Sequence, residues 1–202
     1  YGMTECPTAA HSSVHDPEDV LRTDGRALDD TEIRIVGPDG TRCAPDTVGE
    51  IRVRGPMIFL GYVDPADDAD AFDEDGFHRT GDLGRVDERG VLTVTGRVKD
   101  IIIRKGENIS AKEIEDVLYT HPKVGDVAVI GVPDRERGEM VLAVVESAPD
   151  AEPLTFDEMV ALCREAGLMT QKIPERLEVV EALPRNQTLN KILKYQLREQ
   201  YG

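Results

Sequence analysis

The first five residues, "YGMTE", place an aromatic ring, a glycine, a hydroxyl and a carboxylate side by side. An aromatic ring can stack on a nucleotide base, the hydroxyl of Thr4 can bond a phosphate oxygen, and the carboxylate of Glu5 suits Mg²⁺. A plain turn explains the same residues at least as well. The segment therefore supplies groups that could bind a ligand, but only the residues around it can show whether a ligand site forms.

A second candidate stands in "FHRTGDLG", where Asp82 directly follows Gly81. We expect Asp82 at the end of a strand, where its carboxylate could accept hydrogen bonds from the hydroxyls of a ribose. The alternative, a turn aspartate that bonds its own backbone, is equally favoured by the local sequence. His78 could act as a base, but no neighbour positions it, and we expect a solvated or packed histidine.

Cations flank the three isoleucines of "GRVKDIIIRKGENISAKEIE", residues 96–115. Lys105 and Gly106 begin a loop that we expect to run through Asn108 into the N-terminus of a helix. The free N–H groups and the positive dipole end at such a place suit anionic or polar ligands. Considered alone, the segment favours a plain strand-to-helix turn with solvated cations.

A last lysine, Lys191, follows the polar loop of "LPRNQTLNKILKYQLREQ" and is expected at the start of a short helix. Lys194 and Arg198 lie about one and two turns later, on much the same face. Lysines on such a helix are usually solvated, so the pattern by itself gives a catalytic amine low weight.

Composition narrows the class of protein. The 202 residues are 40% apolar and carry a net charge of −16, enough for one large or two small domains. Nucleic acid is an unfavoured partner because phosphate backbones need a basic surface. Neither a transmembrane segment nor a signal peptide is recognisable. The scattered Cys6, Cys43 and Cys163 fit neither disulfides nor a metal site, which indicates a reducing compartment, and we expect a cytoplasmic protein.

Short strands and turns are predicted up to about residue 98. "EIRIVGPDG" and "GEIRVRGP" alternate with period two, so Ile33 and Ile35 share one face and Ile51 and Val53 another. "GVLTVTGR" is a third such strand. The acidic stretch "DPADDADAFDEDG" is expected to form an exposed loop or short helix.

From about residue 100, strands alternate with helices. Ser110 with Glu113, and Thr155 with Glu158, each predict a capping box that starts a helix, and Gly167 closes the second. "DVAVIGV" and "MVLAVVES" predict strands buried on both faces, "RLEVVEAL" a last strand and "NKILKYQLREQ" a last helix. This pattern is typical of helices packed on a small sheet.

Charge supports a division between these two parts. All ten basic residues of 1–98 are arginines, whereas every lysine lies at 99 or beyond. We therefore predict two domains, 1–98 and 99–202, and expect any chemistry that needs a lysine in the second.

Taken together, four segments resemble the adenylate-forming superfamily of acyl- and aryl-CoA synthetases (AMP-dependent synthetases and ligases), peptide-synthetase adenylation domains and firefly-type luciferases. The segments are "YGMTE", "GEIRVRGPMIFLGY", "FHRTGDLGRVDERGVLTVTGRVKDIIIRKGENISAKEIE" and "LPRNQTLNKILK". The resemblance covers essentially the whole chain. It implies an α+β fold, with the β-rich terminal subdomain of a large adenylating domain followed by a small, mobile α/β C-terminal domain.

The resemblance also implies ligands and roles. ATP, Mg²⁺ and coenzyme A would be used with a small carboxylic acid. Tyr1 would stack near adenine, with Gly2 in the same ATP/AMP site. Thr4 would hold the α-phosphate, and Glu5 would help to hold Mg²⁺.

For the remaining residues, the resemblance implies that Asp82 grips the ribose, with Arg97 nearby. Lys99 would be the hinge, and Lys105–Gly106 would line the path of the CoA pantetheine. Lys191 would contact carboxylate and phosphate oxygens during adenylation.

Two departures from the family pattern stand out. The family usually has glycine directly before the terminal lysine, whereas Leu189 and Asn190 precede Lys191 here, one residue longer. Lys194 is therefore a weaker candidate for the same role. Ile103 also stands where many of these synthetases carry a lysine.

We accordingly expect the C-terminal portion of an ATP-dependent acyl-CoA ligase for a fatty or aromatic acid. The chain begins at Tyr1 inside dense sequence, so an N-terminal domain with the phosphate loop is expected upstream, and the chain alone is expected to be inactive. The alternatives are a peptide-synthetase adenylation domain and a non-catalytic nucleotide- or CoA-binding fragment.

Overall fold

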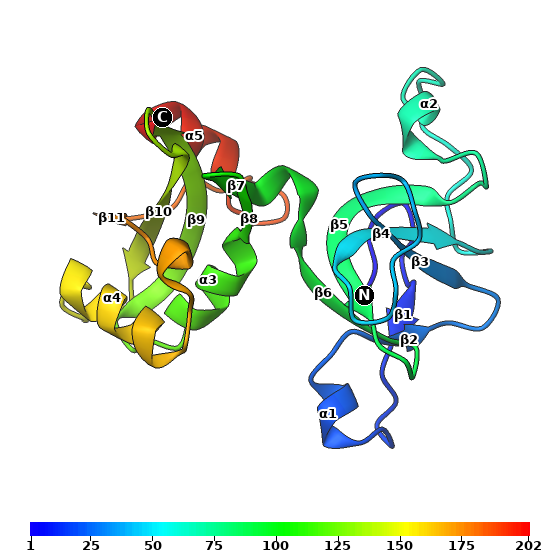
Figure 1. Ribbon diagram of the computed structural model, residues 1–202, viewed down its shortest axis with the longest axis horizontal. Coiled ribbons are helices and arrows are strands. Elements are labelled where there is room, and N and C mark those ends of the chain that lie inside the picture. The colour runs from blue at the N-terminus through cyan, green and yellow to red at the C-terminus, as the bar shows by residue number, and fades with distance from the viewer. The chain divides into compact units, whose positions relative to one another are not determined.

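The computed structural model describes residues 1–202 and divides into two compact units, Tyr1–Lys99 and Asp100–Gly202 (Figure 1). Each unit is built on a sheet of its own. The first unit consists mainly of strands and turns, and the second mixes strands with helices, as the sequence predicts. None of the helices combines the length and apolarity needed to cross a membrane.

The first unit is an antiparallel six-stranded sheet in the order β1-β2-β6-β5-β4-β3. Its strands are β1 Ala10–His11, β2 Gly25–Ala27, β3 Glu32–Val36, β4 Gly49–Arg54, β5 His78–Val86 and β6 Val91–Arg97. The three predicted strands are confirmed as β3, β4 and β6. The alternation of apolar and polar residues places one face of each strand in the core: Ile51 and Val53 of β4 are fully buried in one cluster with Ile35 of β3.

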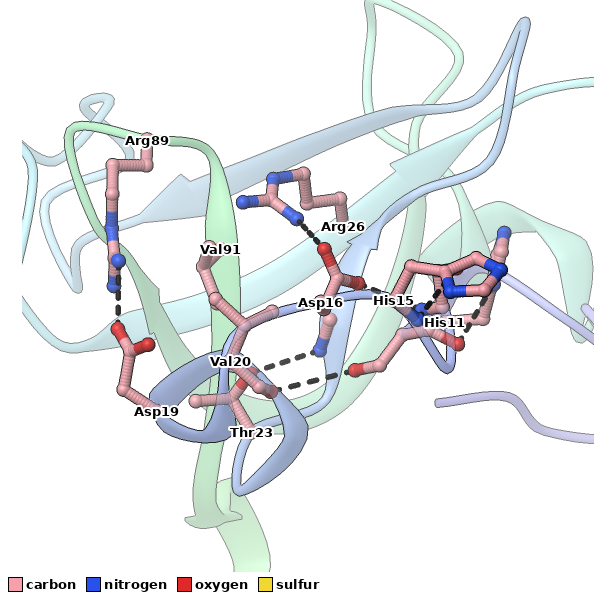
Figure 2. A network of polar contacts seen from close by, with 12 residues as sticks. His11, His15, Asp16, Asp19, Val20, Thr23, Arg26, Arg89 and Val91 are labelled. Carbon is pink, nitrogen blue, oxygen red and sulfur yellow. Dashed lines mark hydrogen bonds and ion pairs between the residues drawn. The ribbon is translucent and has the colours of Figure 1, made fainter.

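Two short helices lie in the loops of this unit, α1 Glu18–Leu21 and α2 Asp68–Ala71. Figure 2 shows how polar contacts hold the segment around α1: Asp16 pairs with Arg26 at 2.9 Å, and Asp19 with Arg89 at 2.7 Å. Helix α2 lies in the acidic stretch, where a loop or short helix was expected. Exposed pairs of this kind contribute little stability, about 0–1 kcal/mol each, so they position loops more than they stabilise the fold.

The second unit contains a five-stranded sheet in the order β11-β10-β7-β8, with β9 also paired to β10. Its strands are β7 Ile101–Arg104, β8 Glu107–Ser110, β9 Val124–Asp134, β10 Gly138–Ser147 and β11 Arg176–Val180, and its helices are α3 Ala111–Leu118, α4 Phe156–Glu165 and α5 Lys194–Tyr201. Only β10 and β11 are parallel. A 3₁₀ turn, η1 Val98–Asp100, connects β6 to β7.

The strands β9 and β10 form the centre of this unit and are buried on both faces, as predicted. Val129 and Val145 point into a cluster shared with α3 and α4, whereas Ile130 and Val144 point into a second cluster that includes Leu197 of α5. Successive residues of a strand face opposite sides, so an uninterrupted apolar run serves two cores at once. Each fully buried side chain of this size contributes about 1.5–3 kcal/mol.

The two predicted capping boxes have different outcomes. The box at α4 is confirmed: the Thr155 side chain accepts from the Glu158 N–H, and the Glu158 carboxylate accepts from the Thr155 N–H. The box at α3 is wrong. Ser110 is the N-cap residue, but its side chain makes no capping hydrogen bond, and the Glu113 carboxylate instead accepts two hydrogen bonds of 2.7 Å from Lys172.

Glu158 should make the stability of this unit depend on pH. Hydrogen bonds from Lys123 and from Thr155 lower the pKa of Glu158 to about 2. The usual glutamate pKa in an unfolded chain is about 4.3, so the stabilisation is complete above that pH and is lost as the pH falls towards 2. We expect Glu158→Gln to flatten the dependence of the free energy of unfolding on pH in that window.

Urea unfolding at a series of pH values would measure this effect, with Glu152→Gln, a nearby exposed carboxylate, as the matched control. Parallel pH profiles for the natural sequence and Glu158→Gln would contradict the expectation.

Candidate functional site

A pocket of about 390 Å³ opens in the first unit, beside the turn that follows Tyr1 and along β5 and the end of β6. It brings together four of the predicted residues. Its lining includes Glu5, Asp82, Arg97 and Lys99, together with Tyr62 and Thr80. Tyr1 lies beside this lining and contacts it through Asp82.

Asp82 is the buried carboxylate of the pocket, and it lies within β5 rather than at the predicted strand end. Its two oxygens are held separately: Oδ1 accepts from Arg97 Nε and Oδ2 from the Tyr1 hydroxyl, each at 2.8 Å. The turn-aspartate alternative is therefore wrong, because the carboxylate bonds side chains from two distant segments. A carboxylate offers about four acceptor sites, so two remain for a ligand.

The strand around Asp82 is irregular, which explains why a polar group can open into a pocket there. Gly81 has φ +69°, a left-handed conformation that favours glycine, and a side chain added there would meet open space. The pairing with β6 shifts register between Leu83 and Gly84. The Asp82 N–H donates to Thr80 Oγ1 at 3.0 Å.

Tyr1 acts as a fixed hydrogen-bond donor to Asp82. Burial raises the pKa of the Tyr1 phenol well above its ordinary value, and the Asp82 charge raises it further. The hydroxyl therefore stays protonated at physiological pH. It can hold Asp82 in one rotamer.

The resemblance of the sequence implies AMP as the ligand of this pocket, and on that expectation Tyr1→Phe should weaken AMP binding by roughly tenfold, because one hydrogen bond to a charged group contributes about 1.5–3 kcal/mol and the Arg97 contact remains. Isothermal titration of AMP into the full-length protein would measure this change. Tyr195→Phe, an exposed tyrosine of the second unit, is the matched control. Unchanged affinity in Tyr1→Phe would show that Arg97 alone suffices to orient Asp82.

The segment after Tyr1 is a tight turn that presents Thr4 and Glu5 at its tip. Met3 and Cys6 exchange backbone hydrogen bonds of 2.9 and 3.2 Å on either side of them. Gly2 permits this path, since a Cβ there would stand 2.2 Å from the carbonyl oxygen of Pro7. The turn interpretation is therefore confirmed, and the ligand roles of Thr4 and Glu5 stay a prediction.

Glu5 is the predicted metal ligand, and its surroundings fit that chemistry. Its Oε1 accepts from the Tyr62 hydroxyl at 3.0 Å, and the carboxylate lines the pocket that Asp82 also lines. Mg²⁺ typically takes one or two protein carboxylates and fills the rest of its shell with water and phosphate oxygens. No group of three or more acidic, histidine or cysteine side chains forms a protein-only metal site.

His78 also lines the pocket, but it is a packed histidine, as expected. It is 3% exposed, its Nδ1 lies 3.1 Å from the Ala71 carbonyl oxygen, and its ring contacts those of Phe59 and Phe72. Sequence reasoning missed Tyr62 and Thr80 as pocket residues, although both stand inside the quoted segments.

In the second unit, Lys105 and Gly106 do not lead into a helix, which corrects the prediction. They form the two-residue turn of the β7–β8 hairpin, with φ +51° and +82°, and α3 begins only after β8. Paired positive φ angles are typical of hairpin turns of this length. The Lys105 N–H donates to the Arg137 carbonyl at 2.8 Å and is not available to a ligand, while the Lys105 side chain is exposed.

Lys191 is exposed on a loop three residues before α5, not at the helix start as predicted. Lys194 begins that helix instead, and its Nζ lies 2.7 Å from Glu115 and 3.9 Å from Asp100. An amine engaged by two carboxylates cannot readily serve a ligand. Of the two candidate lysines, Lys191 is the accessible one.

Two protein-family models match the chain, one in each of its two units. The model described as "AMP-binding enzyme" matches residues 1–63, and the model described as "AMP-binding enzyme C-terminal domain" matches residues 113–189.

Known proteins extend this similarity over almost all residues. A medium-chain fatty-acid–CoA ligase of Escherichia coli is 41% identical over 98% of the chain, and a pyochelin synthase, PchD, of Pseudomonas aeruginosa is 43% identical over 91%. The o-succinylbenzoate CoA synthetase of Bacillus subtilis, solved with its acyl-adenylate intermediate, is 36% identical over 98% of the chain with a TM-score of 0.89. The chain spans only 35%, 33% and 40% of these three proteins.

Proposed function

We propose a function from one premise: this chain belongs to the AMP-binding enzyme family of adenylate-forming ligases. We infer that it is the C-terminal portion of an ATP-dependent carboxylate–CoA ligase. The carboxylate oxygen of the acid would attack the α-phosphorus of ATP and release pyrophosphate. The CoA thiolate would then attack the acyl carbon and release AMP. Residues 1–98 would complete the large domain, and 99–202 would be the mobile C-terminal domain.

The observation that carries the proposal is the held carboxylate of Asp82. Tyr1 and Arg97 each occupy one acceptor site, on different oxygens of the Asp82 carboxylate. Each oxygen keeps one free acceptor site, and the two hydrogen bonds fix the directions of these free sites. Two adjacent hydroxyls on a rigid ring, as in a ribose, match a pair of acceptors fixed in this way. Thr4 and Glu5, at the tip of the neighbouring turn, would meet the α-phosphate and its Mg²⁺.

Lys191 would supply the missing positive charge. Adenylation brings two anions together, and an ammonium ~4 Å from an oxyanion contributes roughly 4 kcal/mol at an effective dielectric near 20. Because Lys191 is exposed on its loop, it could reach a ligand when rotation about Lys99 brings the C-terminal domain to the nucleotide. In the thiol-transfer state, the hairpin turn Lys105–Gly106 would line the pantetheine path.

A pyrophosphate-release screen of the full-length protein tests the proposal. ATP, Mg²⁺ and CoA would be supplied with a panel of fatty, alicyclic and aromatic acids, and thioester formation followed by mass spectrometry. We expect one class of acid to give both products, and residues 1–202 alone to give almost no pyrophosphate. Robust release by residues 1–202 alone would overturn the assignment of this chain as a part of the machinery.

The similarity to pyochelin synthase PchD favours a second candidate, an adenylating domain that loads a carrier protein. The thiol acceptor distinguishes the two, because such a domain would release pyrophosphate with its acid but form no acyl-CoA. A non-catalytic binding fragment, the third possibility, would bind AMP and release no pyrophosphate with any acid.

A further inference from the structure

The loop that carries Lys191 is folded by hydrogen bonds to a single residue, Asn186. Its side-chain Oδ1 accepts from the N–H of Leu189 at 3.1 Å and from the N–H of Lys191 at 2.9 Å. Its own N–H donates to the Lys191 carbonyl at 2.9 Å, and its carbonyl accepts from the Asn190 N–H at 3.2 Å. Lys191 is thus held at both its N–H and its carbonyl by the same asparagine.

Asn190 stands directly before Lys191, at the position where the family usually has glycine. It has φ +54°, which lies in the left-handed region where glycine is favoured and asparagine is among the best-tolerated other residues. The loop is one residue longer than usual, yet the position before the lysine keeps a backbone conformation that suits glycine. Asn190 therefore holds a left-handed conformation that a glycine before the lysine would adopt freely.

Arg185 fastens this loop to the sheet. It pairs with Ile192 across the base of the loop, and its guanidinium donates to the Asn190 carbonyl at 3.3 Å. The same group contacts the carboxylates of Asp126 in β9 and, at 3.5 Å, of Glu146 in β10. The loop is therefore tied to two central strands of its unit.

Asp126 is a suitable anchor because it stays charged. Burial alone would raise its pKa, but hydrogen bonds from Tyr119 and Arg185 outweigh that effect and lower the pKa of Asp126 below its ordinary value. A charged carboxylate between a tyrosine and an arginine holds the guanidinium in one place.

We propose that Asn186 is a positioning residue that presets the Lys191 backbone for carboxylate activation, with Asn190 and Arg185 as its supports. The inference rests on the proposed function, since it takes Lys191 as the amine that meets the reacting oxygens. A preset loop avoids ordering several residues in every catalytic cycle. Positioning matters here because a misplacement of about 1 Å can cost ~10²-fold in rate.

The first test is Asn186→Ala in the full-length enzyme. We expect kcat for pyrophosphate release to fall about tenfold to hundredfold, with KM for ATP and acid changed by less than about twofold. Thioester formation from preformed acyl-adenylate should be unchanged. Asn186→Asp keeps an acceptor oxygen at the same place and should restore most of the rate. Gln187→Ala, an exposed neighbour in the same loop, is the matched control.

Substitutions of Asn190 give a second, independent test of the positioning role. Asn190→Gly should preserve kcat, because glycine adopts the same φ freely, whereas Asn190→Val should lower kcat about as much as Asn186→Ala, because a β-branched residue is strained there. Equal rates for the glycine and valine variants, or no rescue by Asn186→Asp, would overturn the positioning role.

Hydrogen exchange of the peptide 184–193 in the full-length enzyme, measured by mass spectrometry, tests the positioning role of Asn186 separately from the catalytic role of Lys191. Asn186→Ala should accelerate exchange in this peptide, and Gln187→Ala should not. Unchanged exchange would overturn the inference whatever the enzyme does. Accelerated exchange together with full adenylation in both Asn186→Ala and Lys191→Ala would overturn the proposed role of Lys191 itself, and the inference with it.

Discussion

Replacement of Lys191 by alanine is expected to slow acyl-adenylate formation in the full-length enzyme by about 10²–10³-fold, the usual cost of removing one well-placed electrostatic donor. The reason is electrostatic: the carboxylate and the α-phosphate repel each other, and Lys191 is the exposed cation of the C-terminal loop. Thioester formation from preformed acyl-adenylate should be largely unaffected, because that step joins no two anions of this kind.

Single-turnover pyrophosphate release and thioester formation measure the two steps separately. Lys112→Ala removes another exposed lysine of the same unit, one that pairs only with Asp116 along α3, and should change neither step. An equal loss in both steps for Lys191→Ala would show that the residue maintains structure instead of supplying charge.

Replacement of Asp82 by alanine is expected to weaken AMP binding by about 10²–10⁴-fold. Two hydrogen bonds from ribose hydroxyls to a carboxylate contribute roughly 1.5–3 kcal/mol each, and each 1.4 kcal/mol is a factor of ten. The effect should exceed that of Tyr1→Phe, because Asp82 would bond the ligand itself, whereas Tyr1→Phe keeps the aromatic ring and removes only the hydroxyl that holds Asp82. Isothermal titration of AMP into the full-length enzyme measures it.

The control must separate binding from folding, since removing Asp82 also leaves Tyr1 and Arg97 without their partner. Adenine binds through its ring, so adenine affinity should be preserved in Asp82→Ala while AMP affinity falls. Glu88→Gln, an exposed carboxylate in the β5–β6 turn, is the matched variant. If AMP affinity survived in Asp82→Ala, the ribose assignment would be wrong.

The sequence predicts the strands of this protein well because their signals are local. Alternation at Ile33, Ile35, Ile51 and Val53 yields two paired strands, and the continuous apolar runs yield β9 and β10 with two cores. The Thr155 box is equally local, since both partners lie within one helical turn. Such patterns need no knowledge of distant residues.

Several of the errors have the opposite origin, in partners far along the chain. Glu113 does not form the predicted capping box, because its carboxylate bonds Lys172, 59 residues away. Asp82 accepts a hydrogen bond from Tyr1, 81 residues away. The error at Lys105 and Gly106 is local, because the apolar period does not reveal the positive φ angles at both positions that make a hairpin turn. The predicted helix start at Lys191 is wrong by three residues, because α5 begins at Lys194, which pairs with Glu115, 79 residues away along the chain.

The absence of lysine before the η1 turn has a practical consequence for handling the molecule. A lysine-specific protease has no cleavage point within residues 1–98, and the first bond open to it follows the exposed Lys99, where the chain leaves the first unit. Digestion of residues 1–202 therefore leaves residues 1–99 in one piece, with Asp82 still beside Tyr1 and Arg97. Amine-reactive dyes, likewise, label Lys99 and the C-terminal unit while sparing the side chains of the rest.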